Sequence, residues 1–213
     1  MKGFVVLLAV TAICLFTSNE ASFAQHKHHK TKSESKADSS HEQSDKKESA
    51  IGKTNTDSIP APRVVNAKAA ASMKVIVGRY LDLKNALSSD KTKEAATAGT
   101  ALESAFKKFD KSNLTASQRK VYEDVEDDAR EHGEHIGANA GNIEHQREHF
   151  DMLSKDMYDL VNAFGSGQLL YKDYCPMYNN KKGAIWLSEK KEIKNPYYGK
   201  KMLTCGSVKE ELR

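Results

Sequence analysis

Four stretches of the chain place apolar residues at alternating steps of three and four, and this repeat constrains the fold more than any other feature. Residues spaced in this way lie on one face of an α-helix. The four stripes are Met73, Ile76, Tyr80, Leu83 and Leu87; Ala95, Ala98, Leu102, Ala105 and Phe109; Val121, Val125, Ala129, His132 and Ile136; and Ile143, Gln146, Phe150, Leu153, Met157, Leu160 and Phe164. Four amphipathic helices with short connections predict a mainly α protein with an antiparallel up-down bundle over residues 61–166.

Local signals indicate where two of these helices begin. Thr115 can cap the third helix, and Gln118 stands three residues later, at the reciprocal position of a capping box. The glycine-containing segment over residues 137–141 interrupts the helical repeat, and Asn142 can cap the fourth helix. We therefore expect the third and fourth helices to form a hairpin with a turn near residue 140.

The segment over residues 167–213 has no long helical repeat. It is expected to form a lobe of short strands and turns packed on the bundle, with extended pieces at residues 168–171 and 183–187. A final helical turn is expected at residues 208–213. Trp186 is the only tryptophan, and we expect it to anchor the lobe with its indole N–H hydrogen-bonded.

Two cysteines in this lobe each have a methionine nearby. Cys175 precedes Met177 by two residues, and Met202 precedes Cys205 by three. Thiolates and thioethers are soft ligands that select soft ions such as Cu(I), so these four residues are candidate metal ligands. The alternative is a structural disulfide between Cys175 and Cys205, for which no methionine is needed. The sequence leaves both interpretations open.

Four histidines flank the turn between the third and fourth helices. His132 and His135 are three residues apart, and His145 and His149 are four apart, so each pair lies on one helix face. Antiparallel pairing would set His135 opposite His145 and His132 opposite His149. Imidazoles suit copper or zinc, and clustered histidines also suit a pH-sensitive role. The alternative is an exposed hairpin whose histidines never converge, and the sequence does not tell whether they would join the cysteines in one site.

The amino terminus has the features of a secretory signal peptide. Lys2 supplies positive charge, an apolar run extends from residue 4 to residue 16, and Ser22 and Ala24 are small residues at the positions read by a signal peptidase. Cleavage after Ala24 is expected to release a periplasmic or otherwise exported, soluble protein. No later stretch is apolar enough to insert into a membrane.

A polar tract follows over residues 25–60. It is dominated by Lys, Ser, Glu, Asp, Thr and His and cannot bury enough apolar surface to offset its ordering entropy, so it is expected to be disordered. Its histidines are His26, His28, His29 and His41. Such tracts capture metal loosely or are simply solvated. The net charge of +4 is small and spread out, which gives no reason to expect nucleic-acid binding.

Several segments resemble a bacterial periplasmic domain of unknown function, which occurs alone or fused to adaptor proteins of copper/silver efflux systems. The segments are residues 146–150, 153–154, 175–177, 183–188, 193–199 and 202–206. The resemblance spans roughly residues 65–210 and implies heavy metals as the ligand and an efflux adaptor or pump as the partner.

These observations favour a heavy-metal-binding protein acting in metal buffering, delivery or efflux, with Cu(I) as the favoured ion and zinc as an alternative. The second hypothesis is a structural or protein-interaction domain held by a Cys175–Cys205 disulfide. An enzyme is not expected, because the chain has no His-Glu-x-x-His zinc motif, no phosphate-binding glycine loop and no Glu-x-x-His motif.

Overall fold

The computed structural model describes residues 65–213. The expected signal peptide and the expected disordered tail over residues 25–60 lie outside the described residues. All statements below concern the described part.

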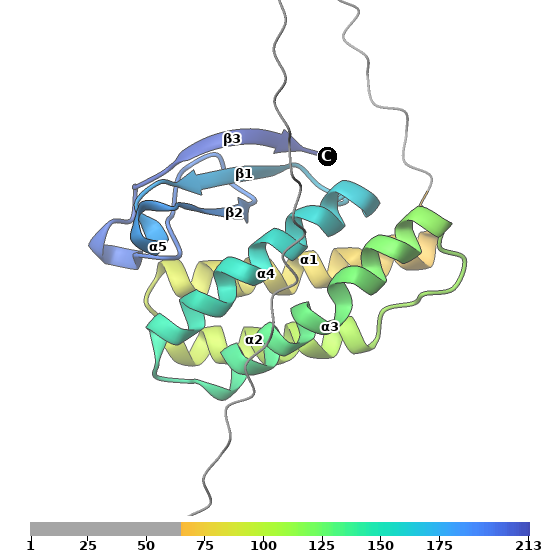
Figure 1. Cartoon of the computed structure of the whole chain (residues 1–213), viewed down its shortest axis with the longest axis horizontal. Helices are drawn as coiled ribbons and strands as arrows, with labels where there is room; N and C mark the ends of the chain where they lie inside the picture. Colours follow the sequence, from red (N-terminus) through yellow and green to blue (C-terminus); the bar gives the residue numbers. More distant parts are fainter. Residues whose placement is uncertain (1–64) are drawn as a thin grey trace, which may run out of the picture. The chain divides into compact units, whose positions relative to one another are not determined.

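This part is mainly helical. Its long helices are α1 (Ala67–Ser88), α2 (Thr92–Lys107), α3 (Ala116–Ala138) and α4 (Ile143–Phe164). Each packs on the next along the chain, and α1 also contacts α4 (Figure 1). The apolar stripes lie in the core as expected; of those positions, only Ala105, Val121, His132 and Ile143 are partly exposed.

The expected caps are present at both helices of the hairpin. The Thr115 side chain accepts a hydrogen bond from the Gln118 backbone N–H at 3.2 Å, and the Gln118 side chain accepts one from the Thr115 N–H at 3.2 Å. Asn142 Oδ1 accepts a hydrogen bond from the His145 N–H at 3.2 Å. These caps satisfy backbone donors that a helix start leaves free, so they fix where α3 and α4 begin.

Glycines let α2 and α3 approach closely. A Cβ atom added at Gly99 would lie 2.8 Å from Ile136 Cγ2 and 2.9 Å from the Gly133 carbonyl oxygen, so a side chain there would push the helices apart. Gly133 therefore faces α2. Because successive helical residues are rotated by about 100°, His132 and His135 lie on the side of α3 turned away from α2.

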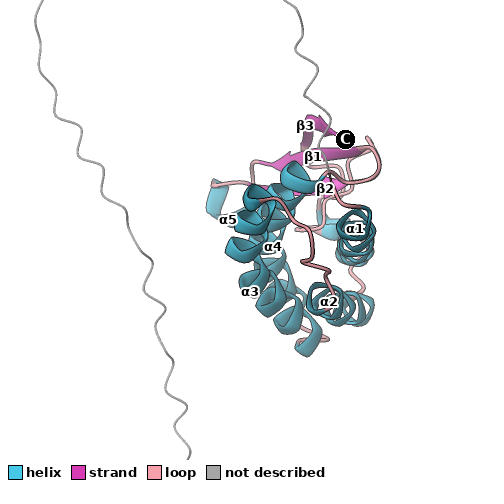
Figure 2. Ribbon diagram, turned by 90° about the vertical axis from the view of Figure 1, so that its right-hand side faces the viewer, coloured by secondary structure: helices cyan, strands magenta, loops and turns pink. Residues whose placement is uncertain are grey.

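A small antiparallel sheet follows the helices. Its strands are β1 (Leu170–Cys175), β2 (Ala184–Ser188) and β3 (Ser207–Leu212), in the order β2-β1-β3. The short elements α5 (Tyr178–Lys181) and η1 (Gly199–Lys201) lie in the connections. The sheet lies along one side of the helices, and β2 contacts α4 (Figure 2).

The expected helical turn at residues 208–213 is wrong, because residues 208–212 belong to β3. The strand pairs with the free edge of β1, with Tyr174 opposite Ser207 and Leu170 opposite Leu212. A single helical turn fixes several residues for one hydrogen bond, whereas an existing strand edge offers a whole ladder of partners.

The sheet packs on the helices through a mixed apolar and polar layer. Trp186 and Leu187 of β2 are fully buried. The Leu187 N–H donates to the Tyr80 hydroxyl at 3.0 Å, and that hydroxyl also lies 2.9 Å from Ser154 Oγ. Trp186 thus anchors the lobe as expected, but its indole N–H has no acceptor among the described residues, contrary to expectation.

Arg147 of α4 holds the C-terminal lobe against the helices. Its Nε donates to the Pro196 carbonyl at 2.7 Å, and its Nη2 donates to the Leu87 carbonyl at 3.1 Å and to Asp90 at 2.7 Å. Gly199 has a φ of 52°, and a Cβ atom there would overlap both Asp90 and Arg147. Glycine is therefore required at this contact by backbone conformation and by space.

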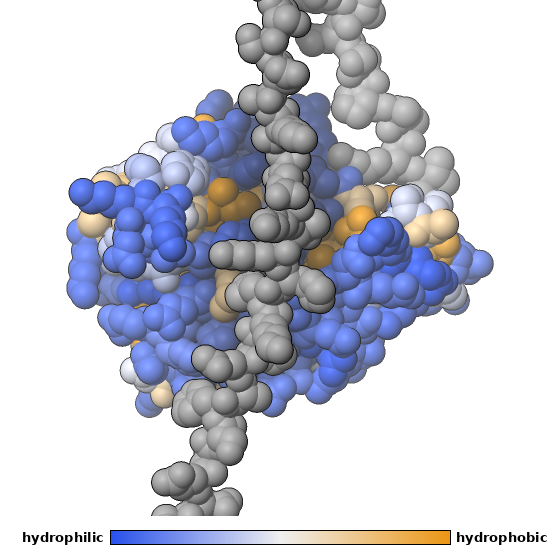
Figure 3. Space-filling view, in the orientation of Figure 1, coloured by the Kyte–Doolittle hydropathy of each residue, from blue (hydrophilic) through white to orange (hydrophobic). Residues whose placement is uncertain are grey.

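The surface in Figure 3 is mostly hydrophilic, with hydrophobic side chains in small patches. The large apolar side chains that remain exposed are Val75, Met152, Leu169, Met177 and Met202. None of the helices described here combines the length and apolarity needed to span a bilayer.

Candidate metal centre

The four histidines of the α3–α4 hairpin converge, as the helical spacing predicts. The ring centroids of His135 and His145 are 6.0 Å apart, and those of His132 and His149 are 5.3 Å apart. His149 is central, because its ring centroid also lies 4.5 Å from that of His135 and 4.6 Å from that of His145. The alternative, an exposed hairpin whose histidines never converge, is therefore wrong.

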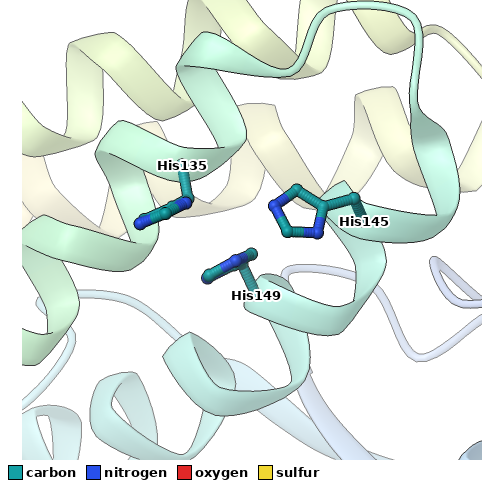
Figure 4. A group of neighbouring side chains, drawn as sticks. All are labelled: His135, His145 and His149. Carbon is teal, nitrogen blue, oxygen red and sulfur yellow. The ribbon is translucent and has the colours of Figure 1, made fainter. Parts of the chain in front are cut away.

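Three of these histidines form a potential ligand set. One ring nitrogen each from His135, His145 and His149 lies within 4.8 Å of the others (Figure 4). A tetrahedral ion bound by imidazoles at about 2.0–2.1 Å requires nitrogens about 3.3 Å apart. Each pair has to close by no more than about 1.5 Å, which side-chain rotation can supply. The cluster could therefore bind a metal ion.

His132 occupies a different position in the cluster. Its Nδ1 lies 3.1 Å from Nδ1 of His149, which is hydrogen-bonding distance. It does not belong to the group whose nitrogens lie within 4.8 Å of one another. The sequence predicts all four histidines as ligands. In the structure, three ring nitrogens converge, whereas His132 lies outside this group and contacts His149.

The surroundings keep the central imidazoles unprotonated. Burial, aided by His135, His132 and His145, lowers the pKa of His149 to about 4. Burial also lowers the pKa of His132, against the opposing charges of Asp128 and Glu131. A metal ion binds the neutral form of imidazole, so no proton has to be displaced from His149 at neutral pH.

The outer side of the cluster is open to solvent. The His135 side chain is 45% exposed and that of His145 is 33% exposed, so an ion has a route to the nitrogens. Glu131 Oε1 lies 3.8 Å from His135 Nε2, and Glu148 Oε2 lies 3.6 Å from His145 Nδ1. These carboxylates can orient the imidazoles and attract a cation.

The two cysteines of the lobe meet. Sγ of Cys175, at the end of β1, lies 3.5 Å from Sγ of Cys205, just before β3, and both are free thiols. Cys175 is buried and Cys205 is partly exposed. Burial and the neighbouring Cys175 thiol raise the pKa of Cys205. The pair is close enough for either a disulfide or a shared soft ion after a small movement.

The methionines are held near this pair by their backbones. The Met202 carbonyl accepts a hydrogen bond from the Cys205 N–H at 3.0 Å, and the Met177 carbonyl accepts one from the Tyr198 hydroxyl at 3.0 Å. Their side chains are 39% and 42% exposed, respectively. The structure thus joins the two cysteines and leaves both thioethers at the surface.

The histidines and the cysteines lie on different sides of α4. Arg147 reaches the lobe at Pro196, and His149 is rotated from it by about 200° around the helix. Among the described residues, no group of three His, Cys, Asp or Glu ligand atoms within 4.8 Å combines an imidazole with a thiol. The three convergent imidazoles and the thiol pair are therefore separate in the structure.

A buried carboxylic acid was missed by the sequence reasoning. Asp173 of β1 is fully buried, and neither of its carboxylate oxygens has a hydrogen-bond partner. It stands opposite Trp186 of β2, whose indole N–H also lacks a partner. Burial raises the pKa of Asp173 to about 7, although the positive charge of Lys84 opposes this shift.

The sequence pattern could not reveal this position, because β1 is irregular. The register between β1 and β3 shifts between Lys172 and Asp173. Leu170 and Asp173 are both buried although they are three residues apart, which breaks the alternation of a regular strand. Arg147 was noted as part of a motif, but its role in holding the lobe depends on contacts far away in the sequence.

Comparison with known proteins gives one family match. Residues 76–168 match the model of DUF3347, which is described as a protein of unknown function. The matched stretch contains all four clustered histidines and Arg147, whereas both cysteines lie beyond its end. No curated protein and no solved structure matches the chain.

Proposed function

We propose that this protein binds a heavy-metal ion, with copper favoured, and acts in metal buffering, delivery or efflux outside the cytoplasm. The observation that carries the proposal is the convergence of His135, His145 and His149 within 4.8 Å. Three imidazoles from two helices leave a coordination position open for exchange with another ligand. An accessible, incompletely coordinated ion suits a protein that passes metal on.

Two features favour copper over other ions. Imidazole nitrogens bind copper and zinc, and copper binds more tightly than zinc at sites of this kind. The second feature is the thiol pair of Cys175 and Cys205, with Met177 and Met202 adjacent in sequence. Soft sulfur ligands favour Cu(I), so we propose this pair as a second position for the reduced ion, with zinc as the alternative at the histidines.

The proposed setting follows from the sequence. The secretory features of residues 1–24 and the resemblance to efflux-associated domains support a periplasmic location and an efflux adaptor or pump as partner. The contacts between consecutive helices support an antiparallel up-down arrangement of α1–α4 as the support of the site. Nothing in the charge pattern favours nucleic acid as a partner.

The test is metal titration of the untagged, full mature protein. Cu(II), Zn(II) and, anaerobically, reduced Cu(I) are each titrated against a competing chelator. We expect one tight equivalent of Cu(II) that is lost in His149→Ala and His135→Ala. The matched control replaces His26, His28 and His29 by alanine and should retain it. Loss of tight binding in the tail variant alone, or no competition at micromolar copper, would refute the proposal.

A second candidate function is a structural or interaction domain without metal. The 3.5 Å separation of the two thiols favours it, because a disulfide needs only a further approach to about 2.05 Å. A bond between Cys175 and Cys205 would stabilise the lobe by about 3–4 kcal/mol through loop closure. Mass spectrometry of protein from its native compartment distinguishes the candidates. A fully oxidised pair that resists reduction, with no metal at the histidines, would support this one.

A further inference from the structure

Among the described residues of the histidine cluster, His132 and His149 are joined by a ring-to-ring hydrogen bond. We propose that His132 is a positioning residue rather than a metal ligand, and that its hydrogen bond with His149 presents Nε2 of His149 to the metal ion. This inference rests on the proposed metal site and assigns separate roles to its four histidines.

The hydrogen bond restricts the tautomers of both imidazoles. Nδ1 of His132 and Nδ1 of His149 are 3.1 Å apart, and two neutral imidazoles can share only one proton at that distance. If His149 donates from Nδ1, its Nε2 carries a free lone pair and can bind a metal. If His132 donates instead, the proton of His149 lies on Nε2 and blocks it. The metal site therefore needs the first arrangement.

Acidic side chains lie near His132 in the sequence. Asp128 lies four residues before His132 on α3, so both side chains occupy the same helix face. The charged groups acting on His132 are Asp128, Glu131 and Lys155, with His135 nearby. When His132 accepts at Nδ1, its own proton lies on Nε2. The Asp128→Asn variant tests whether the charge of Asp128 contributes to the choice of tautomer.

The distances agree with this division of roles. His132 lies outside the group of nitrogens that fall within 4.8 Å of one another, whereas His149 is inside it. Metal-ligating imidazoles usually donate their other N–H to a fixed acceptor, which sets the ring orientation. A histidine is an unusual acceptor, and here it is the Nδ1 of His132 that lies within hydrogen-bonding distance of His149. The proposal therefore gives His132, which the sequence predicts as a ligand, this outer role instead.

The first test uses the protein without metal. Long-range ¹H–¹⁵N NMR at neutral pH assigns the tautomer of each histidine. We expect His149 protonated at Nδ1 and His132 protonated at Nε2, with the His149 preference weakened in His132→Ala. A His149 ring protonated at Nε2 in the wild-type protein would overturn the proposal. Because no metal is present, this result is independent of whether the proposed function holds.

The second test measures affinity for Cu(II) or Zn(II) in matched variants. His132→Asn keeps an acceptor near the position of Nδ1, whereas His132→Ala removes it. We expect a loss of about 10–100-fold in affinity for His132→Ala, partial recovery in His132→Asn and a smaller loss in Asp128→Asn. The control is Asp127→Asn, a neighbouring carboxylate whose side chain is 91% exposed and which should leave affinity unchanged.

Spectroscopy separates positioning from ligation. The number of nitrogen ligands, from electron paramagnetic resonance with Cu(II), should be the same in wild type and His132→Asn. Loss of one nitrogen in that variant, or equal losses of affinity in His132→Asn and His132→Ala, would show that His132 is a ligand and overturn its positioning role. Absence of metal binding in every variant would remove the proposed function and leave the tautomer result to stand by itself.

Discussion

Replacement of Asp173 by asparagine should stabilise the protein at neutral pH. Asp173 is fully buried without a hydrogen-bond partner, and burial raises its pKa from 3.8 to about 7. The folded protein therefore retains a proton that the unfolded chain releases between these values. The stability that this group contributes is complete below pH 3.8 and is lost as the pH rises through 7.

The magnitude follows from the shift. A displacement of about three pKa units corresponds to roughly 4 kcal/mol of unfolding free energy lost between pH 3 and pH 7. Asparagine is neutral at every pH and nearly isosteric, so it removes this loss. We expect the unfolding free energy of the Asp173→Asn protein to match that of the wild type near pH 4 and to exceed it by up to about 4 kcal/mol at pH 7–8.

Urea unfolding at several pH values is the assay, and the structure supplies a local reporter. Trp186 faces Asp173 across the two strands and is the only tryptophan, so its fluorescence should change with a midpoint near pH 7. The variant should lack this transition. A stability difference that does not vary with pH, or a variant less stable than wild type at pH 7, would refute the reasoning.

Four further predictions concern the helices and the lobe. Burial lowers the pKa of His149 from 6.5 to about 4, so the stability that this residue contributes is present above pH 6.5 and falls as the pH drops towards 4. The His149→Phe variant should therefore lose less stability in acid, as measured by circular dichroism melts. Arg147→Lys should cost about 2–4 kcal/mol, because lysine cannot reproduce the three guanidinium contacts, and thermal unfolding measures the loss. Gly199→Ala should also lower the melting temperature, because its Cβ would overlap Asp90; an alanine variant as stable as wild type would contradict this account. Cys175→Ser combined with Cys205→Ser should leave Cu(II) affinity at the histidines unchanged, and a parallel loss would show that the two places communicate.

The helical part of the fold could be predicted because its signals are local. Apolar spacing fixes the faces, and the Thr115 and Asn142 caps fix the starts of two helices. A short turn between two helices then determines which residues stand opposite each other. That is why the pairing of His135 with His145 and of His132 with His149 could be stated in advance.

The lobe could be predicted only in outline because its structure depends on distant partners. The terminal strand β3 forms because it pairs with an edge of β1, and the sequence of residues 207–212 alone does not predict this pairing. The irregular register at Asp173 hides which residues of β1 face inward. The different roles of His132 and His149 also depend on ring placement at a scale of one or two ångströms, which residue spacing does not resolve.

A single turn of α4 contacts both the lobe and the histidine cluster, because Arg147 lies between His145 and His149 in the sequence. One side of this turn carries the lobe, and the other side carries two of the three convergent imidazoles. Movement of the lobe against α4 therefore acts on the same helical turn that carries His145 and His149. The hydrogen bond from Arg147 Nε to the Pro196 carbonyl is one contact through which the two regions are mechanically coupled.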